Sequence, residues 1–221
     1  MLFNICYVTI PLLNLYHFVE LIYKEERLII NKEKLAKIIR IITIPPIMAL
    51  FLFIVLFIFK DNLFVELADF IAGILFLVVI PTLAYPFQKF IPKFKDKGRD
   101  GQRKLAFIVT LLSYTGMLLY VLMANVSPDM LLICLTYFLT VLILTLSNKL
   151  HIKASGHAAS CSSPLVFFVY YFSWKALIPS VLAFLTILWS SLVTKRHTVK
   201  EFMVGSIICI ISFAISYVII F

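Results

Sequence analysis

The sequence predicts an all-α integral membrane protein, folded as a polytopic bundle of transmembrane helices. Of its 221 residues, 62% are hydrophobic, and the mean hydropathy is +1.05, whereas soluble domains are about 45–50% apolar. Apolar runs long enough to cross a bilayer recur along the chain. These runs are continuous rather than alternating, which is the pattern of helices that satisfy their own backbone in lipid. One membrane domain, residues 41–221, therefore follows an N-terminal hydrophobic and amphipathic membrane segment, residues 1–40.

The expected elements follow one another with short connections. Residues 1–22 are apolar but contain Asn14, His17 and Glu20, so that they form either a span or a helix in the interface. Residues 23–40 are basic and amphipathic, which suits a helix on the membrane surface. Seven spans are expected after it, at about 41–59, 63–85, 105–124, 129–147, 157–173, 176–193 and 198–221.

The basic residues predict the orientation of this bundle. With these spans, the loops 87–104, 148–156 and 194–200 lie on one face, together with segment 23–40. All of the 20 Lys and Arg residues except Lys60 and Lys175 belong to that face. Positively charged loops stay on the cytoplasmic side. We therefore expect this face in the cytoplasm, in the plasma membrane of a prokaryote.

Composition also narrows the function classes. The net charge of +9 resides in short loops between spans, so it indicates contact with anionic membrane lipids and not with nucleic acid. The cysteines are scattered through apolar segments, at Cys6, Cys134, Cys161 and Cys209, without metal-ligand spacing or a disulfide framework. No cluster of carboxylates indicates a Mg²⁺ site. The sequence thus predicts neither a metal nor another cofactor.

Two short polar stretches at the basic face contain the residues suited to chemistry. His197 and Glu201 are four residues apart at the start of the last helix, where the carboxylate can orient the imidazole. A histidine oriented in this way can attack phosphorus. His157 follows Ser155 and Gly156 at the start of another helix, where backbone N–H groups favour an anion and the imidazole can protonate a leaving group. Lys149, Lys153, Arg103 and Arg196 are the candidates to neutralise a phosphoryl group.

These stretches resemble two motifs of the type 2 phosphatidic acid phosphatase/vanadium haloperoxidase superfamily. Ser155-Gly156-His157 is similar to its second motif, Pro-Ser-Gly-His. The stretch from Ser190 to Glu201 is similar to its third motif, Ser-Arg followed by a histidine and an aspartate. The resemblance covers about residues 145–221 and implies a six-helix lipid phosphatase-like core, with one or two extra N-terminal helices. It implies that His197 is the nucleophile, Glu201 orients it and His157 is the general acid.

The sequence departs from the family pattern at four places. Ala154 stands where the second motif has proline, Ser191 where the third has arginine, and Glu201 where the third has aspartate. The first motif is not intact. Its lysine would come from Lys149 or Lys153, and its arginine from Arg99 or Arg103.

The expected function is metal-independent hydrolysis of a lipid phosphate or diphosphate, through a phosphohistidine. Phosphatidate-like lipids and isoprenyl phosphates or diphosphates are the candidate substrates, and a cytoplasmic site favours a prenyl diphosphate. Two alternatives stay open. The same site would support phospho-group transfer to an acceptor other than water. A degenerate member acting in membrane interaction or transport would explain Ser191.

Overall fold

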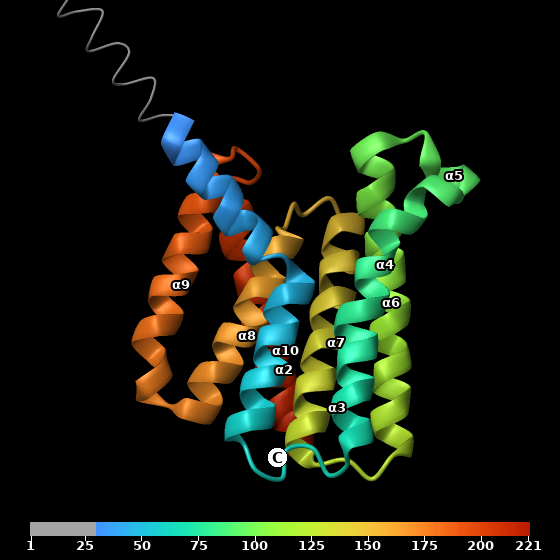
Figure 1. Cartoon of the computed structure of the whole chain (residues 1–221), viewed down its shortest axis with the longest axis vertical. Helices are drawn as coiled ribbons and strands as arrows, with labels where there is room; N and C mark the ends of the chain where they lie inside the picture. Colours follow the sequence, from blue (N-terminus) through green and yellow to red (C-terminus); the bar gives the residue numbers. More distant parts are fainter. Residues whose placement is uncertain (1–29) are drawn as a thin grey trace, which may run out of the picture.

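A computed structural model describes residues 30–221 of the chain, and every regular element in this part is helical (Figure 1). The predicted all-α class is thereby confirmed; residues 1–22, and the beginning of segment 23–40, lie outside the described residues. A helix over Ile30–Ile42 comes first. The elements after it are α2 (Pro45–Phe59), α3 (Leu67–Ile74), the π-helix η1 (Leu75–Val79), α4 (Ile80–Phe87), the 3₁₀ turn η2 (Gln88–Phe90), α5 (Pro92–Lys95), α6 (Gly98–Met123), α7 (Pro128–Lys149), α8 (Gly156–Phe172), α9 (Trp174–Val193) and α10 (Val199–Ile220).

Each of the seven predicted spans corresponds to a helix or an unbroken helical run, but two of the helices are short for a membrane crossing. Within residues 30–221, five stretches are long and apolar enough to cross a membrane: Leu67–Phe90, Asp100–Met123, Pro128–Lys149, Trp174–Val193 and Val199–Ile220. A sixth crossing results if Ile30–Ile42 and α2 are one span, bent by 57°. The break lies at Thr43 and Ile44, directly before Pro45 and Pro46, which start α2 and cannot continue the preceding helix. At 15 and 17 residues, α2 and α8 are shorter than the roughly 20 residues of a full span.

Small residues allow the helices around α8 and α10 to approach closely. Ala158, Ala159 and the serines Ser162 and Ser163 are buried on α8. The Ser162 hydroxyl donates to Ser206 of α10 over 3.1 Å. The run of small residues after His157 therefore serves helix packing, as helix interfaces in membranes generally do.

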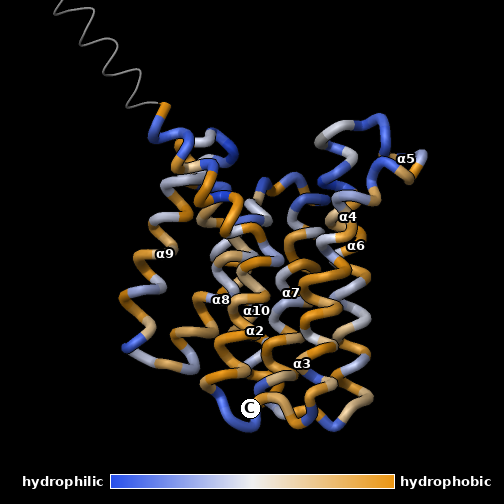
Figure 2. Tube along the Cα trace, viewed as in Figure 1, coloured by the Kyte–Doolittle hydropathy of each residue, from blue (hydrophilic) through white to orange (hydrophobic). Residues whose placement is uncertain are grey.

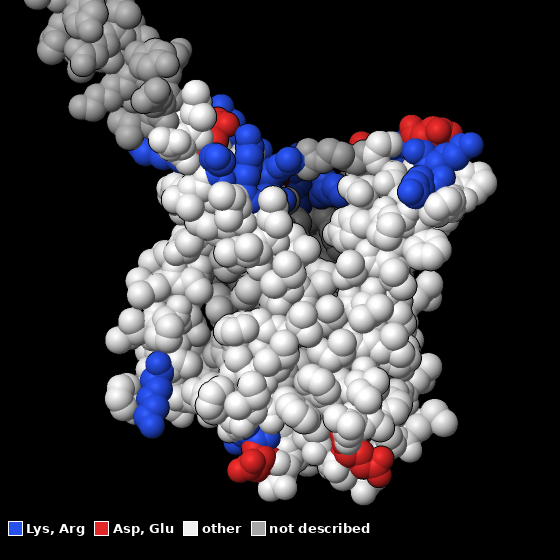
Figure 3. Space-filling model, viewed as in Figure 1, with Lys and Arg blue, Asp and Glu red and all other residues white. Residues whose placement is uncertain are grey.

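The polar loops lie at the two ends of the bundle, and the basic ones lie at one end. Figure 2 shows an apolar middle with polar segments at the two ends. In Figure 1, the connections α4–α6, α7–α8 and α9–α10 all lie at the upper end, together with the helix Ile30–Ile42. Figure 3 shows most of the visible Lys and Arg side chains at that end. We call it the basic face. The expectation that these loops share one face is confirmed, and the N-terminal helix that was expected on the membrane surface lies against it.

Candidate active site

A cavity of about 310 Å³ lies inside the bundle below the basic face. Its wall is built by the end of the Ile30–Ile42 helix, by α2, α4, α6, α7 and α8, and by the loop between α9 and α10. Figure 3 shows basic side chains around a hollow in this face. Five strongly basic or imidazole side chains are in the wall: Arg40, Arg103, Arg196, His157 and His197. The cavity therefore joins both histidine stretches to three guanidinium groups.

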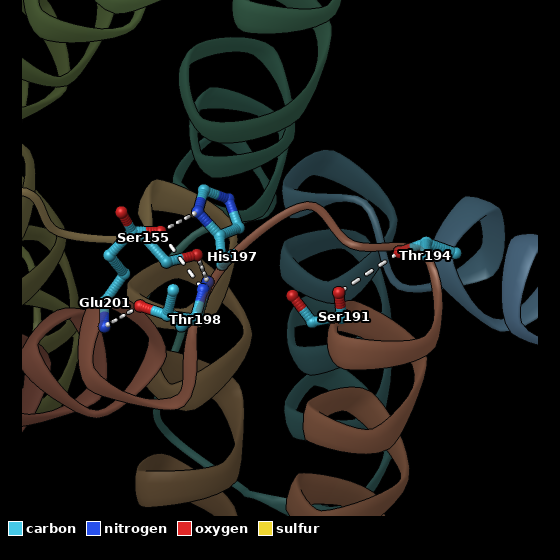
Figure 4. A network of polar contacts seen from close by, with 7 residues as sticks. Ser155, Ser191, Thr194, His197, Thr198 and Glu201 are labelled. Atoms are coloured by element: carbon cyan, nitrogen blue, oxygen red, sulfur yellow. Dashed lines mark hydrogen bonds and ion pairs between the residues drawn. The ribbon is translucent and has the colours of Figure 1, made fainter.

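His197 is held by Glu201, as the spacing predicted. The imidazole Nδ1 lies 3.3 Å from Glu201 Oε2, and the two side chains are 15% and 23% exposed. With the carboxylate accepting from Nδ1–H, the other ring nitrogen Nε2 carries the free lone pair. Figure 4 shows this pair beside Thr198 and Ser155.

The same carboxylate also starts helix α10. Glu201 Oε2 accepts from the Thr198 backbone N–H over 3.2 Å, and Thr198 Oγ1 accepts from the Glu201 N–H over 3.2 Å. This reciprocal capping box fixes the first turn of α10. Glu201 is therefore both a helix cap and the group that orients His197, and the cap holds the carboxylate in place.

The second histidine stretch is tied to the first through the main chain. The Ser155 N–H donates to the Glu201 carbonyl over 2.9 Å. Gly205, one turn further along α10, packs so closely that a Cβ there would lie 2.3 Å from the Ser155 carbonyl oxygen. Only glycine allows this approach. The two motifs are thus one rigid unit, although they are some forty residues apart in the sequence.

His157 lies in the first turn of α8 and faces the cavity. Ser155 is the N-cap of this helix, and its hydroxyl accepts from the Ala158 N–H over 3.2 Å. His157 Nε2 lies 3.5 Å from Thr43 Oγ1, whose hydroxyl donates to the Ile39 carbonyl over 2.8 Å. Because that hydroxyl proton is used, Thr43 Oγ1 can accept from the imidazole N–H. The Thr43 carbonyl in turn accepts from the Cys161 thiol over 3.0 Å.

The predicted phosphate ligands separate into two groups. Arg103, Arg196 and Gly156 line the cavity. Lys149 and Lys153 are exposed outside its wall, although Lys153 interacts electrostatically with Glu201. Ser155 is fully buried as a helix cap, and the side chain of Arg99 lies outside the described part of the chain.

Arg40 was not selected from the sequence as a site residue. The sequence places it at the end of a segment with six basic residues, where it counts as a determinant of orientation. In the structure it lines the cavity. The helix that carries it is fixed to α9, because the Ser190 hydroxyl donates to the Ala36 carbonyl over 2.7 Å, one turn before Arg40. The break at Pro45 and Pro46, just after this helix, was the available signal that the segment turns into the bundle.

Ser191, which stands where the similar motif has arginine, is buried outside the cavity wall. Its carbonyl accepts from the Arg196 N–H over 3.1 Å, while the Lys195 N–H donates to the Leu192 carbonyl over 2.9 Å. Lys195 itself has a φ of +50°. This is the Schellman pattern that ends a helix. It turns the chain so that Arg196 and His197 line the cavity.

The charges around His197 set its protonation. Burial lowers the pKa of His197 below its usual value of 6.5, and the positive charges of Arg40 and Arg103 lower it further. The hydrogen bond to Glu201 raises this pKa and opposes both effects. His197 is therefore neutral at neutral pH, which is the form that a nucleophilic role would require.

The donor set of the cavity suits an anion. Among residues 30–221, no three His, Cys, Asp or Glu side chains are grouped closely enough to hold a metal ion. Three guanidinium groups beside two imidazoles present many N–H donors and positive charge to a phosphate-like group. No protein-family model, no curated protein and no solved structure matches the chain.

Proposed function

We propose that this chain is an integral membrane phosphatase that hydrolyses a lipid phosphate or diphosphate through a phosphohistidine. The observation that supports it most is the pairing of His197 with Glu201 at a cavity that also holds His157 and three arginines. Many large apolar side chains are exposed on the helices around the cavity. A ligand that enters this cavity can keep its phosphate among the cations and its tail in the bilayer.

The proposed reaction has two steps. His197 Nε2 attacks phosphorus, the N–P bond forms, and the bond from phosphorus to the leaving oxygen breaks. His157, in its protonated, cationic form, gives a proton to that oxygen and becomes neutral. Arg40, Arg103 and Arg196 stabilise the negative charge on the other phosphoryl oxygens.

The second step returns the enzyme to its starting state. Water attacks phosphorus as His157 takes one of its protons, and the N–P bond breaks to release inorganic phosphate. During the first step His197 becomes cationic. The Glu201 carboxylate 3.3 Å from Nδ1 stabilises that charge.

Orientation forms part of the proposal. The positive charge of the basic face favours the cytoplasmic side, so that the substrate would be a lipid phosphate made there. A reporter inserted in the α7–α8 connection, after residue 150, tests this orientation. An extracytoplasmic reading would refute it.

Phosphate release by the purified protein in detergent tests the activity. Phosphatidate, an isoprenyl monophosphate and an isoprenyl diphosphate are compared in the presence of EDTA. His197→Asn should abolish release, whereas His151→Asn should retain it, because His151 is exposed outside the cavity wall and has a φ of +61° that asparagine tolerates. Mass spectrometry at alkaline pH should find a phosphoryl adduct on His197. Release without an adduct, or undiminished release by His197→Asn, would refute the mechanism.

A further inference from the structure

Two hydroxyl groups in the cavity wall lie buried without a partner. Tyr137 and Thr140 of α7 are 3% and 4% exposed. Neither hydroxyl has a hydrogen-bond partner within residues 30–221, and both residues line the cavity. Buried polar groups in proteins are nearly always hydrogen-bonded. Because both residues line the cavity, a group that enters it is the nearest candidate partner for these hydroxyls.

Both hydroxyls lie deeper in the bundle than the histidines. Leu144 of α7 belongs to one buried cluster with Ala154 and Ala159, which lie on either side of His157 in the chain. Along α7, Thr140 is one turn and Tyr137 two turns further from the basic face, about 6 and 10 Å at 1.5 Å per residue. A phosphate held by the arginines would thus have these hydroxyls beneath it.

The lower part of the cavity is polar on more than one side. Thr110 and Tyr114 of α6 and Ser160 and Ser163 of α8 also line it. The rings of Tyr114 and Tyr137 meet edge to face, 5.8 Å apart. A plain hydrocarbon tail next to the phosphate would leave the Tyr137 and Thr140 hydroxyls unpaired, whereas an oxygen-bearing group would accept from them.

We propose that Tyr137 and Thr140 form a second polar subsite, which binds an oxygen-bearing group of the lipid close to its phosphate. This inference rests on the proposed function and narrows its substrate class. It favours oxygenated lipid phosphates, such as esters or ethers of a polyol phosphate, over prenyl phosphates. The hydroxyls determine specificity and take no part in the bond changes at phosphorus.

The test measures binding, so that it stands even if no phosphate is released. The probes are non-cleavable phosphonate analogues of a diacylglycerol phosphate, of its dialkyl ether and of a prenyl phosphate. Binding of each to the full chain in detergent is measured at equilibrium. The wild type should bind the two oxygenated probes more tightly than the prenyl one. The difference between ester and ether shows whether the carbonyl or the glycerol oxygen is recognised.

Substitution of the two hydroxyls should remove this preference. Tyr137→Phe and Thr140→Val should each weaken the oxygenated probe about tenfold, the usual effect of one lost hydrogen bond, and leave the prenyl probe unchanged. Thr136→Val is the matched control. Thr136 is also fully buried with no partner for its hydroxyl in the described part of the chain, and it lies one turn away outside the cavity wall.

Stability provides a second readout. Since the two hydroxyls have no partner in the ligand-free protein, their removal should not lower the unfolding temperature. Equal binding of all probes by the wild type, or equal weakening of all probes by the variants, would overturn the subsite. If the protein bound the oxygenated probes preferentially but released no phosphate, the phosphatase proposal would be refuted and the subsite proposal would stand.

Discussion

Gly205→Ala tests whether the two histidine motifs work as one rigid unit. The new Cβ would lie 2.3 Å from the Ser155 carbonyl oxygen, whereas an ordinary contact is at least 3.4 Å. The obstacle is backbone, so α10 and the start of α8 must separate by about 1 Å. Overpacking of this kind costs about 1–3 kcal/mol, and alanine regains about 1 kcal/mol of helix propensity. The net loss of stability is therefore small, at most about 2 kcal/mol.

The effect on the reaction should be much larger. The separation weakens the hydrogen bond from Ser155 to the Glu201 carbonyl and moves His157 relative to His197. A misplacement of about 1 Å costs about a hundredfold in rate. Phosphate release should fall by about that factor while the protein stays folded at the assay temperature.

Gly116→Ala is the control, because its Cβ would meet only the Phe76 side chain, 2.8 Å away and outside the cavity wall. Full kcat/KM in folded Gly205→Ala would refute the reasoning.

The remaining predictions concern the charges. Because the pKa of His197 lies below 6.5 and the neutral form attacks, kcat/KM for an activated phosphate ester, whose leaving group needs no proton from His157, should fall with decreasing pH only below about 6.5; a fall that begins near pH 7.5 would contradict this. Arg40→Gln should lower kcat/KM about 10- to 100-fold. It should also move the acid limb of the pH profile to higher pH, since the Arg40 charge lowers the pKa of His197. Lys37→Gln, on an exposed side chain of the same helix, should change neither kcat/KM nor the position of that limb. Glu201→Gln keeps an oxygen for the helix cap but loses the charge. We therefore expect kcat to fall about a hundredfold or more, while the free energy of unfolding falls by less than about 1 kcal/mol. A loss of activity no larger than the loss of stability explains would indicate that Glu201 serves only as a cap. Ser191→Arg should destabilise the protein by several kcal/mol, because it buries a charge outside the cavity. Ser191→Ala should leave stability and activity unchanged. Denaturation midpoints and phosphate release are measured for the two variants.

Local sequence signals were sufficient to predict the helices and the contact between His197 and Glu201. The i,i+4 spacing of His197 and Glu201 determines their contact because both lie at the first turn of one helix. The capping residues Thr198 and Ser155 likewise start their helices where the sequence indicated. In contrast, the shortness of α2 depends on Pro45 and Pro46, which move its start inward from residue 41.

Contacts between distant segments were harder to predict. Lys149 and Lys153 are close to His157 in the sequence but lie outside the cavity wall, whereas Arg40 is over a hundred residues away and lines it. The sequence shows only that these residues share a face. Which of them reach the cavity depends on how the Ile30–Ile42 helix packs on α9, through a bond that no local pattern indicates. The same holds for Gly205, whose role depends on the distance between two helices.

The arrangement of the arginines bears on how this site could work despite Ser191. An arginine at position 191 would lie at a fully buried site, next to the turn that directs Arg196 into the cavity. Here the third guanidinium comes from Arg40, on a helix that the Ser190 hydroxyl fixes to the end of α9. Since Ser190 and Ser191 are neighbours, the same end of α9 that lacks the arginine binds the helix that supplies one. The N-terminal helix is therefore part of the cavity wall, and its removal should abolish anion binding even where the two histidines remain in place.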